Sequence, residues 1–297
     1  MAPGGGVGGD VRPGVGRGRH VDPPPLVIKQ SGIERGGPRS DDLSLGGLPH
    51  VVSIEGKSSP RAERTVVHLR DWHLVPRELF DKDVKSEAGR DLSKEKLDRL
   101  YAEHLDAVES VQTQLDAVIR ELAARNPGLP VYVEGLTDDG VNVFKLKAAA
   151  LSDVAAGEIA EARRSLDEVK AMKGQKAADL AKKYEALVAR HRAESLELGA
   201  VLGPAAEGQV EVRPLEDADA LKKAEPRWMG GKFRPDSEGT RAREETMARR
   251  LASAKEPVVV VLLGGAHDLR EPLSRHAPRT RYVLLTTQAY REASGGP

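Results

Sequence analysis

Residues 257–269, PVVVVLLGGAHDL, contain the most strand-like segment of the chain. Six consecutive aliphatic residues, 258–263, are mostly β-branched and are bounded by Pro257 and Gly264. Such a run is typical of a strand buried on both faces, as the central strands of parallel sheets are. His267 follows Gly264 by three residues. Because ligands of open α/β sheets bind beyond the carboxyl ends of the strands, we expect His267 at a functional site. The alternative is that His267 merely completes a loop.

Other short strands and intervening helices extend this pattern along the chain. Strand-like composition recurs at residues 65–69, 130–135, 208–214 and 281–286. Apolar residues at three- and four-residue steps predict a long amphipathic helix over 93–125, capped by Ser93. A basic helix is predicted over 237–254. Strands that alternate with helices predict an α/β fold with a mostly parallel central sheet flanked by helices.

Two further regions have distinct compositions. Residues 138–199, rich in Ala, Glu, Lys and Leu, predict a long helical hairpin insertion with a hinge at Gly174. Its functional alternative is a coiled-coil partner surface, although the heptads are not sustained over three or four repeats. Residues 1–61 are dense in Gly, Pro and charge and predict a disordered tail, with 50–54 as a candidate edge strand. Residues 62–297 are then a single α/β domain.

The composition limits the classes of function. Lys plus Arg and Asp plus Glu number 46 each, so no global field draws the chain toward nucleic acid or an anionic membrane. Cysteine is absent, which leaves metal binding to His and carboxylate side chains. No segment has membrane-spanning length and the start lacks a signal-peptide apolar region, so we expect a cytoplasmic protein. We also expect a small-molecule or peptide substrate. The oligomeric state stays open.

Polar residues follow four of the predicted strands. These residues are His73, Glu134, Glu216 and His267. A parallel sheet gathers such positions at one edge, and two imidazoles with carboxylates are a sufficient ligand set for Zn, Mn, Fe or Co. A bound divalent metal would activate water and polarise a carbonyl for hydrolysis. The alternative is that these residues cap helices and pair with Arg70 or Arg243. No Gly-x-Ser-x-Gly nucleophile elbow or phosphate-binding glycine motif is present.

The order of these motifs resembles the TraB/TIKI and ChaN-like superfamily, which is linked to the erythromycin esterase-like proteins. The matching elements are His73, Val133-Glu134, Arg243-Glu244-Glu245-Thr246-Met247 and Gly264-Gly265-Ala266-His267. The resemblance covers residues 65–286 in discontinuous pieces. This chain departs from the family pattern at Arg70, because the family's first histidine usually follows a glycine three residues earlier.

The resemblance implies an α/β fold in which His73, Glu134 and His267 face one cleft. It also implies that Arg243 and Glu244 support this site. Some members are described as metal-dependent proteases, and others as esterases or haem-binding proteins. We therefore expect a metal-assisted hydrolase of peptide or ester bonds, in which the two histidines and Glu134 hold the divalent metal.

A second carboxylate would serve as the general base of this hydrolase, either Glu216 or Glu244. One alternative is a metal-independent esterase-like enzyme, in which His73 or His267 is the general base and Glu134 orients it. Another is a protein that binds haem or a small ligand without catalysis. An interaction protein that uses the helices of 138–198 is the third alternative.

Overall fold

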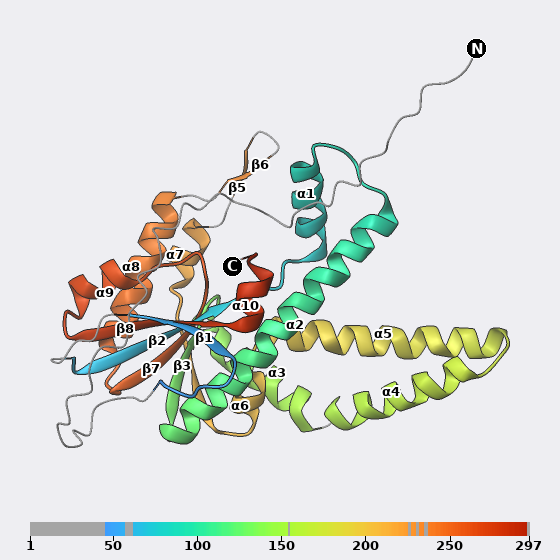
Figure 1. Ribbon diagram of the computed structural model, residues 1–297, viewed down its shortest axis with the longest axis horizontal. Coiled ribbons are helices and arrows are strands. Elements are labelled where there is room, and N and C mark those ends of the chain that lie inside the picture. The colour runs from blue at the N-terminus through green and yellow to red at the C-terminus, as the bar shows by residue number, and fades with distance from the viewer. Residues whose placement is uncertain are drawn as a thin grey trace, which may run out of the picture.

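The computed structural model describes residues 45–56, 62–153, 155–224, 227–229, 232–234 and 237–295. Its centre is a six-stranded sheet in the order β1-β8-β2-β7-β3-β4 (Figure 1). The strands are β1 (Val51–Glu55), β2 (Arg64–Asp71), β3 (Leu129–Val133), β4 (Val210–Pro214), β7 (Val258–Gly264) and β8 (Thr280–Thr287). β1 runs antiparallel to β8, and the other neighbours pair in parallel. The predicted α/β fold with a mostly parallel sheet is therefore confirmed.

β7 lies inside the sheet, between β2 and β3, as its aliphatic composition predicts. Its side chains alternate between two apolar clusters, since successive residues of a strand point to opposite faces. Val260 and Leu262 pack in the cluster that contains α2 (Lys94–Arg125). Val259, Val261 and Leu263 pack in the cluster formed with α8 (Ser237–Ser253) and the region of α9 (Arg270–His276). Both faces of β7 are consequently covered by helices.

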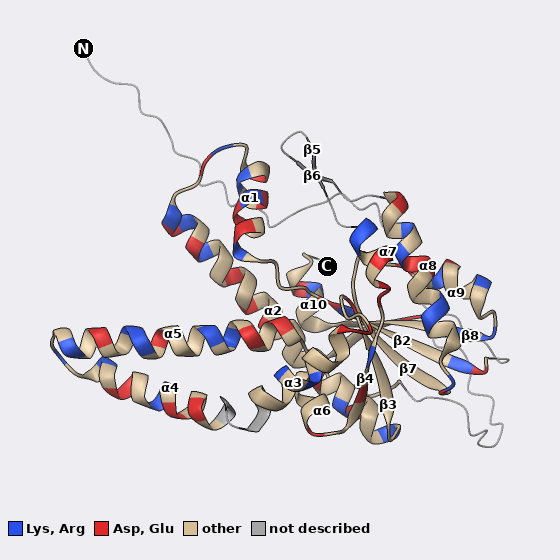
Figure 2. Cartoon of the chain, turned by 180° about the vertical axis from the view of Figure 1, so that it is seen from behind, with Lys and Arg blue, Asp and Glu red and all other residues tan. Residues whose placement is uncertain are grey.

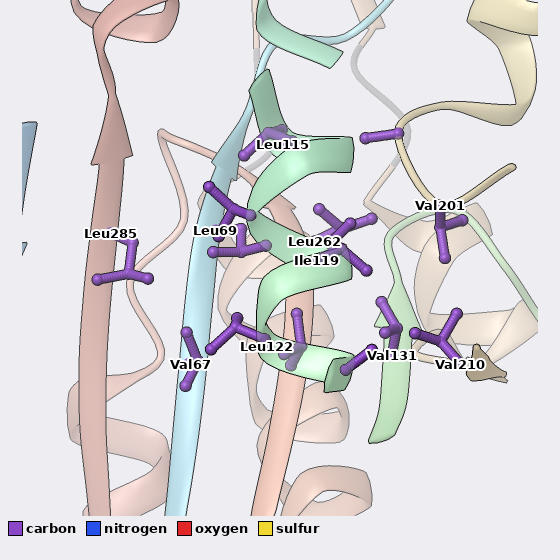
Figure 3. Close-up of a cluster of buried hydrophobic side chains, with 14 of the residues drawn as sticks. Val67, Leu69, Leu115, Ile119, Leu122, Val131, Val201, Val210, Leu262 and Leu285 are labelled. Atoms are coloured by element: carbon purple, nitrogen blue, oxygen red, sulfur yellow. The ribbon is translucent and has the colours of Figure 1, made fainter. Parts of the chain in front are cut away.

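The long helix α2 provides most of the apolar contact on one face of the sheet. Figure 3 shows Leu115, Ile119 and Leu122 of this helix beside Leu69 and Leu262 of the strands. Each such fully buried aliphatic side chain stabilises the fold by about 1.5–3 kcal/mol. The predicted cap is also confirmed, because the Ser93 hydroxyl accepts a hydrogen bond from the backbone N–H of Lys96 at 3.3 Å.

The predicted helical insertion is made of three helices rather than two. They are α3 (Gly140–Asp153), α4 (Ala155–Ala171) and α5 (Gln175–Leu198). α4 and α5 form the protruding hairpin, and charged residues of both signs are spread along it (Figure 2). Gly174, the predicted hinge, precedes α5 with φ of 112°. α3 instead belongs to the α/β body, because Phe144 and Ala148 are buried in the core.

The prediction of a disordered tail over 1–61 is wrong for residues 45–56. Leu45 and Leu48 are buried in the core, and β1 pairs with β8 as the candidate edge strand predicted. This short segment belongs to the fold because β8 supplies hydrogen-bond partners for its backbone. The core supplies apolar contacts for its leucines. Residues 1–44 and 57–61 lie outside the described residues. β1 lies beyond β8 and is therefore the edge strand on this side of the sheet.

Shorter elements connect these parts. They are α1 (Arg77–Ala88), α6 (Leu202–Ala206), α7 (Ala218–Lys223), α10 (Gln288–Ala293), and the strands β5 (Arg227–Met229) and β6 (Lys232–Arg234). β5 and β6 pair antiparallel in a separate two-stranded sheet. Within the described residues, no helix combines the length and apolar character needed to cross a membrane.

Candidate functional site

The ends of the parallel strands bring the predicted site residues together. His73 follows β2, Glu134 follows β3 and His267 follows β7, each within a few residues of its strand. The buried Glu216 follows β4. Arg243 and Glu244 reach the same place from α8. All six predicted residues thus contribute to one network of hydrogen bonds and ion pairs.

Glu134 is the centre of this network, and its side chain is 12% exposed. Its Oε2 atom accepts hydrogen bonds from the Nε2 of His73 at 2.7 Å and from the backbone N–H of Gly264 at 2.5 Å. Its Oε1 atom accepts from the Arg243 guanidinium at 2.9 Å and lies 3.3 Å from Nε2 of His267. Burial opposes its charge, but hydrogen bonds and charges from both histidines hold the pKa of Glu134 well below its usual range. Glu134 is therefore an anion that three cationic side chains, those of His73, His267 and Arg243, surround.

His73 is the solvent-facing member of the network, with a side chain that is 45% exposed. Its Nδ1 atom lies 3.6 Å from Oδ2 of Asp71. Burial disfavours the imidazolium form, but the hydrogen bond and charge of Glu134 outweigh it and raise the pKa of His73 to about 9. This histidine is the titratable group of the network that a substrate can reach most directly.

His267 is more enclosed, with a side chain that is 12% exposed. Its Nδ1 atom bonds to Oε1 of Glu244 at 2.9 Å. Burial again opposes the positive charge, and the hydrogen bonds to Glu134 and Glu244 outweigh it and raise the pKa of His267 to about 9. Glu244 is therefore hydrogen-bonded to His267 and stabilises its cationic form.

Arg243 joins two buried carboxylates. Its Nε donates to Oε1 of Glu216 at 3.0 Å, and its terminal nitrogen pairs with Glu216 and with Glu134. Glu216 is 0% exposed, and its Oε2 has no hydrogen-bond partner among the described residues. A carboxylate without water is costly unless it is paired, so Arg243 makes the burial of Glu216 tolerable. The predicted alternative of pairing with Arg243 is thus realised for Glu134 and Glu216.

The glycine after β7 is required by the close approach of the site. A Cβ atom at Gly264 would lie 2.6 Å from Nε2 of His73 and 3.3 Å from Oε2 of Glu134. Any side chain at this position would therefore displace the imidazole from the carboxylate. Gly265 is equally confined, because a Cβ atom there would overlap the hydroxyl of Tyr290.

A metal ion does not fit the side chains as they are arranged here. Among the described residues, no group of three His, Asp or Glu side chains has a geometry that could hold one. The Nε2 atoms of His73 and His267 both face oxygens of Glu134, and the Arg243 guanidinium lies 3.4 Å from Nε2 of His267. The predicted divalent metal stays a prediction.

Sequence reasoning did not assign two contributors to the site. Asp71 faces Nδ1 of His73, and its position two residues before His73 in a polar cluster was the available signal. The backbone N–H of Gly264 binds Glu134, and the glycine pair after the apolar run was the signal for this contact. His68, in β2, is fully buried.

A cavity beside the sheet lies away from this network. Its volume is about 420 Å³, and it is lined by parts of α3, α6 and β4, including Phe144, Ala148 and Val210. Its charged lining residues in the described structure are Lys145 and Glu211. We place the functional site at the strand ends instead, because the titratable side chains with perturbed pKa values converge there.

The fold and the site define an α/β protein with a carboxylate–imidazole–guanidinium cluster at the carboxyl edge of its parallel strands. No protein-family model matches the chain, and no curated protein and no solved structure matches it. The resemblance to the TraB/TIKI and ChaN-like superfamily stays a prediction.

Proposed function

We propose that the protein is a hydrolase of ester or peptide bonds and that His73 transfers the proton in its reaction. The observation that supports this most is the 2.7 Å hydrogen bond between Nε2 of His73 and Oε2 of Glu134. The imidazole is 45% exposed whereas the carboxylate is 12% exposed. An accessible imidazole oriented by a buried carboxylate has the components of a general acid–base catalyst.

The proposed reaction uses the two nitrogens of His73 differently. A carboxylate can only accept hydrogen bonds, so in neutral His73 the proton resides on Nε2, facing Glu134. Nδ1 then accepts a proton from water as the water oxygen bonds to the substrate carbonyl carbon. The resulting imidazolium, stabilised by Glu134, returns this proton to the departing alcohol or amine as the C–O or C–N bond breaks. His267 and Arg243 help to keep Glu134 ionised.

This reaction has a defined pH dependence. With a pKa of about 9, His73 is mostly protonated at neutral pH and cannot act as a base in that form. The rate should rise about tenfold per pH unit and level off near pH 9, because only the neutral imidazole accepts a proton. A rate that falls over this interval would contradict a general-base role.

The direct test is hydrolysis of nitrophenyl esters and of fluorogenic peptides by the full chain. His73→Gln should abolish the activity, because its amide cannot accept the proton. His276→Gln is the matched control, since His276 also pairs with a carboxylate, that of Glu245, but lies on α9 outside the site. Full activity of folded His73→Gln protein would exclude the proposal.

Metal-assisted hydrolysis is the second candidate, and it would require His73 and His267 to turn their Nε2 atoms from Glu134 toward the ion, because the described side chains as arranged do not hold a metal. Two imidazoles and a carboxylate are donors that Zn, Mn, Co and Fe accept, and the unpartnered Oε2 of the buried Glu216 is a further oxygen donor nearby. Activity that disappears after chelation and returns with one of these ions would favour it. The absence of a thermal shift with Mn, Co or Zn would count against it, because a ligand of the native state stabilises that state.

We expect a small-molecule or peptide substrate and a cytoplasmic location. Haem titration followed at the Soret band separates a haem-binding protein from both hydrolases, because neither hydrolase requires a bound haem.

A further inference from the structure

A third histidine lies behind the site but takes no part in the proposed reaction. His68 is in β2 and is 0% exposed. Its Nε2 lies 3.0 Å from the carbonyl oxygen of Leu263, and its Nδ1 lies 2.5 Å from the hydroxyl of Tyr282. Both ring nitrogens are therefore engaged with groups of the neighbouring strands β7 and β8.

The partners of His68 determine where its proton resides. A carbonyl oxygen can only accept, so Nε2 carries a hydrogen and donates it to Leu263. Burial lowers the pKa of His68 to about 4, and the imidazole is neutral with one proton. Nδ1 is then bare and accepts the hydroxyl proton of Tyr282. The direction of both hydrogen bonds follows from this single tautomer.

One peptide group connects His68 to the site. The carbonyl of Leu263 and the N–H of Gly264 belong to the same peptide unit, and this N–H donates to Oε2 of Glu134 at 2.5 Å. The same oxygen accepts from Nε2 of His73 at 2.7 Å. A donor chain thus runs from Tyr282 through His68 and the peptide to Glu134.

We propose that His68 is a positioning residue that holds Oε2 of Glu134 in place to bind His73, acting through the Leu263–Gly264 peptide. Hydrogen bonds in such a chain polarise one another, so a donor at the carbonyl of a peptide strengthens the bond from its N–H. His68 touches neither His73 nor Glu134 through any hydrogen bond among the described residues. Its effect on catalysis rests on the proposed function, but the chain itself exists without any reaction.

The test measures the amide proton of Gly264 by NMR in the labelled, deuterated full chain. His68→Leu removes the donor to Leu263 and should move this resonance upfield, as a weakened hydrogen bond does. Tyr282→Phe removes only the outer bond and should give a smaller upfield change. His68→Gln keeps a side-chain N–H and should retain most of the wild-type shift.

Val66→Ala is the matched control for core damage. Val66 is 0% exposed, lies in the same strand two residues before His68, and belongs to the apolar cluster that contains Leu263. This variant should lose stability and leave the Gly264 resonance in place. The proposal is overturned if His68→Leu leaves the resonance unmoved, or if Val66→Ala moves it equally.

The remaining variants decide the question if His68→Leu does not fold. The proposal then requires an upfield change in Tyr282→Phe that is absent in His68→Gln, and equal shifts in the two variants would contradict it. The NMR measurement needs no substrate, so it can succeed even if His73→Gln retains hydrolysis and the proposed function fails. In an active enzyme, His68→Leu should lower kcat with little change in KM, and His68→Gln should restore kcat.

Discussion

Replacing Glu134 with Gln should lower the pKa of His73 from about 9 to its ordinary value of 6.5 or below. Burial favours the neutral imidazole, whereas the hydrogen bond and the charge of Glu134 favour the cation. Gln has nearly the shape of Glu and retains an oxygen acceptor, but it removes the charge 2.7 Å from Nε2. The weaker attraction of Asp71, at 3.6 Å, remains in the variant.

The same substitution should change how stability depends on pH. A histidine whose pKa is raised in the folded state contributes stability that is fully present below its unfolded value. For His73 and His267 that contribution is lost as the pH rises from 6.5 through about 9. The wild-type protein should therefore lose stability across this interval, and Glu134→Gln should show a flatter profile because both imidazoles contact Glu134.

The assays are NMR titration of the histidine ring resonances and urea unfolding at pH 6 and pH 9. Glu245→Gln provides the control, since it removes a carboxylate of α8 that pairs with His276 and Arg275 instead of the site histidines. The control should leave the His73 titration unchanged. A wild-type His73 that titrates near 6.5, or a Glu134→Gln variant that still titrates near 9, would refute the reasoning.

Two further substitutions test the packing of the site. Gly264→Ala places a Cβ atom 2.6 Å from Nε2 of His73 and should cost about 1–3 kcal/mol in thermal or urea unfolding, as overpacking does. Gly157→Ala is its control, because no atom lies within 4 Å and the helix should become slightly more stable; equal losses would contradict the close approach. Arg243→Leu leaves the fully buried Glu216 unpaired and should cost about 3–5 kcal/mol in urea unfolding. A loss near zero would show that Glu216 does not need this partner.

The local sequence pattern predicts those helices and strands that their own residue composition favours. The β-branched run of 258–263 predicted a central strand, and the period of 93–125 predicted α2. Residues 45–56 fell within the predicted disordered tail, with 50–54 as only a candidate strand, because β1 depends on hydrogen bonds from β8, more than 200 residues away in the chain. α3 was assigned to the protruding insertion because its sequence alone does not show that Phe144 packs against the core.

The candidate site likewise has features that the sequence predicts and features that only the packing determines. The sequence by itself determined that His73, Glu134 and His267 would follow strands, because short apolar runs end at defined residues and parallel strands share one carboxyl edge. Only the tertiary structure decides which atoms of these side chains form hydrogen bonds with one another. The insertion of Arg243 between Glu216 and Glu134, and the donor chain from His68 to Glu134, both depend on register and packing between segments far apart in the chain. Hydrogen bonds act over about 3 Å, so a pattern of residue types cannot specify them until the strands and α8 are in place.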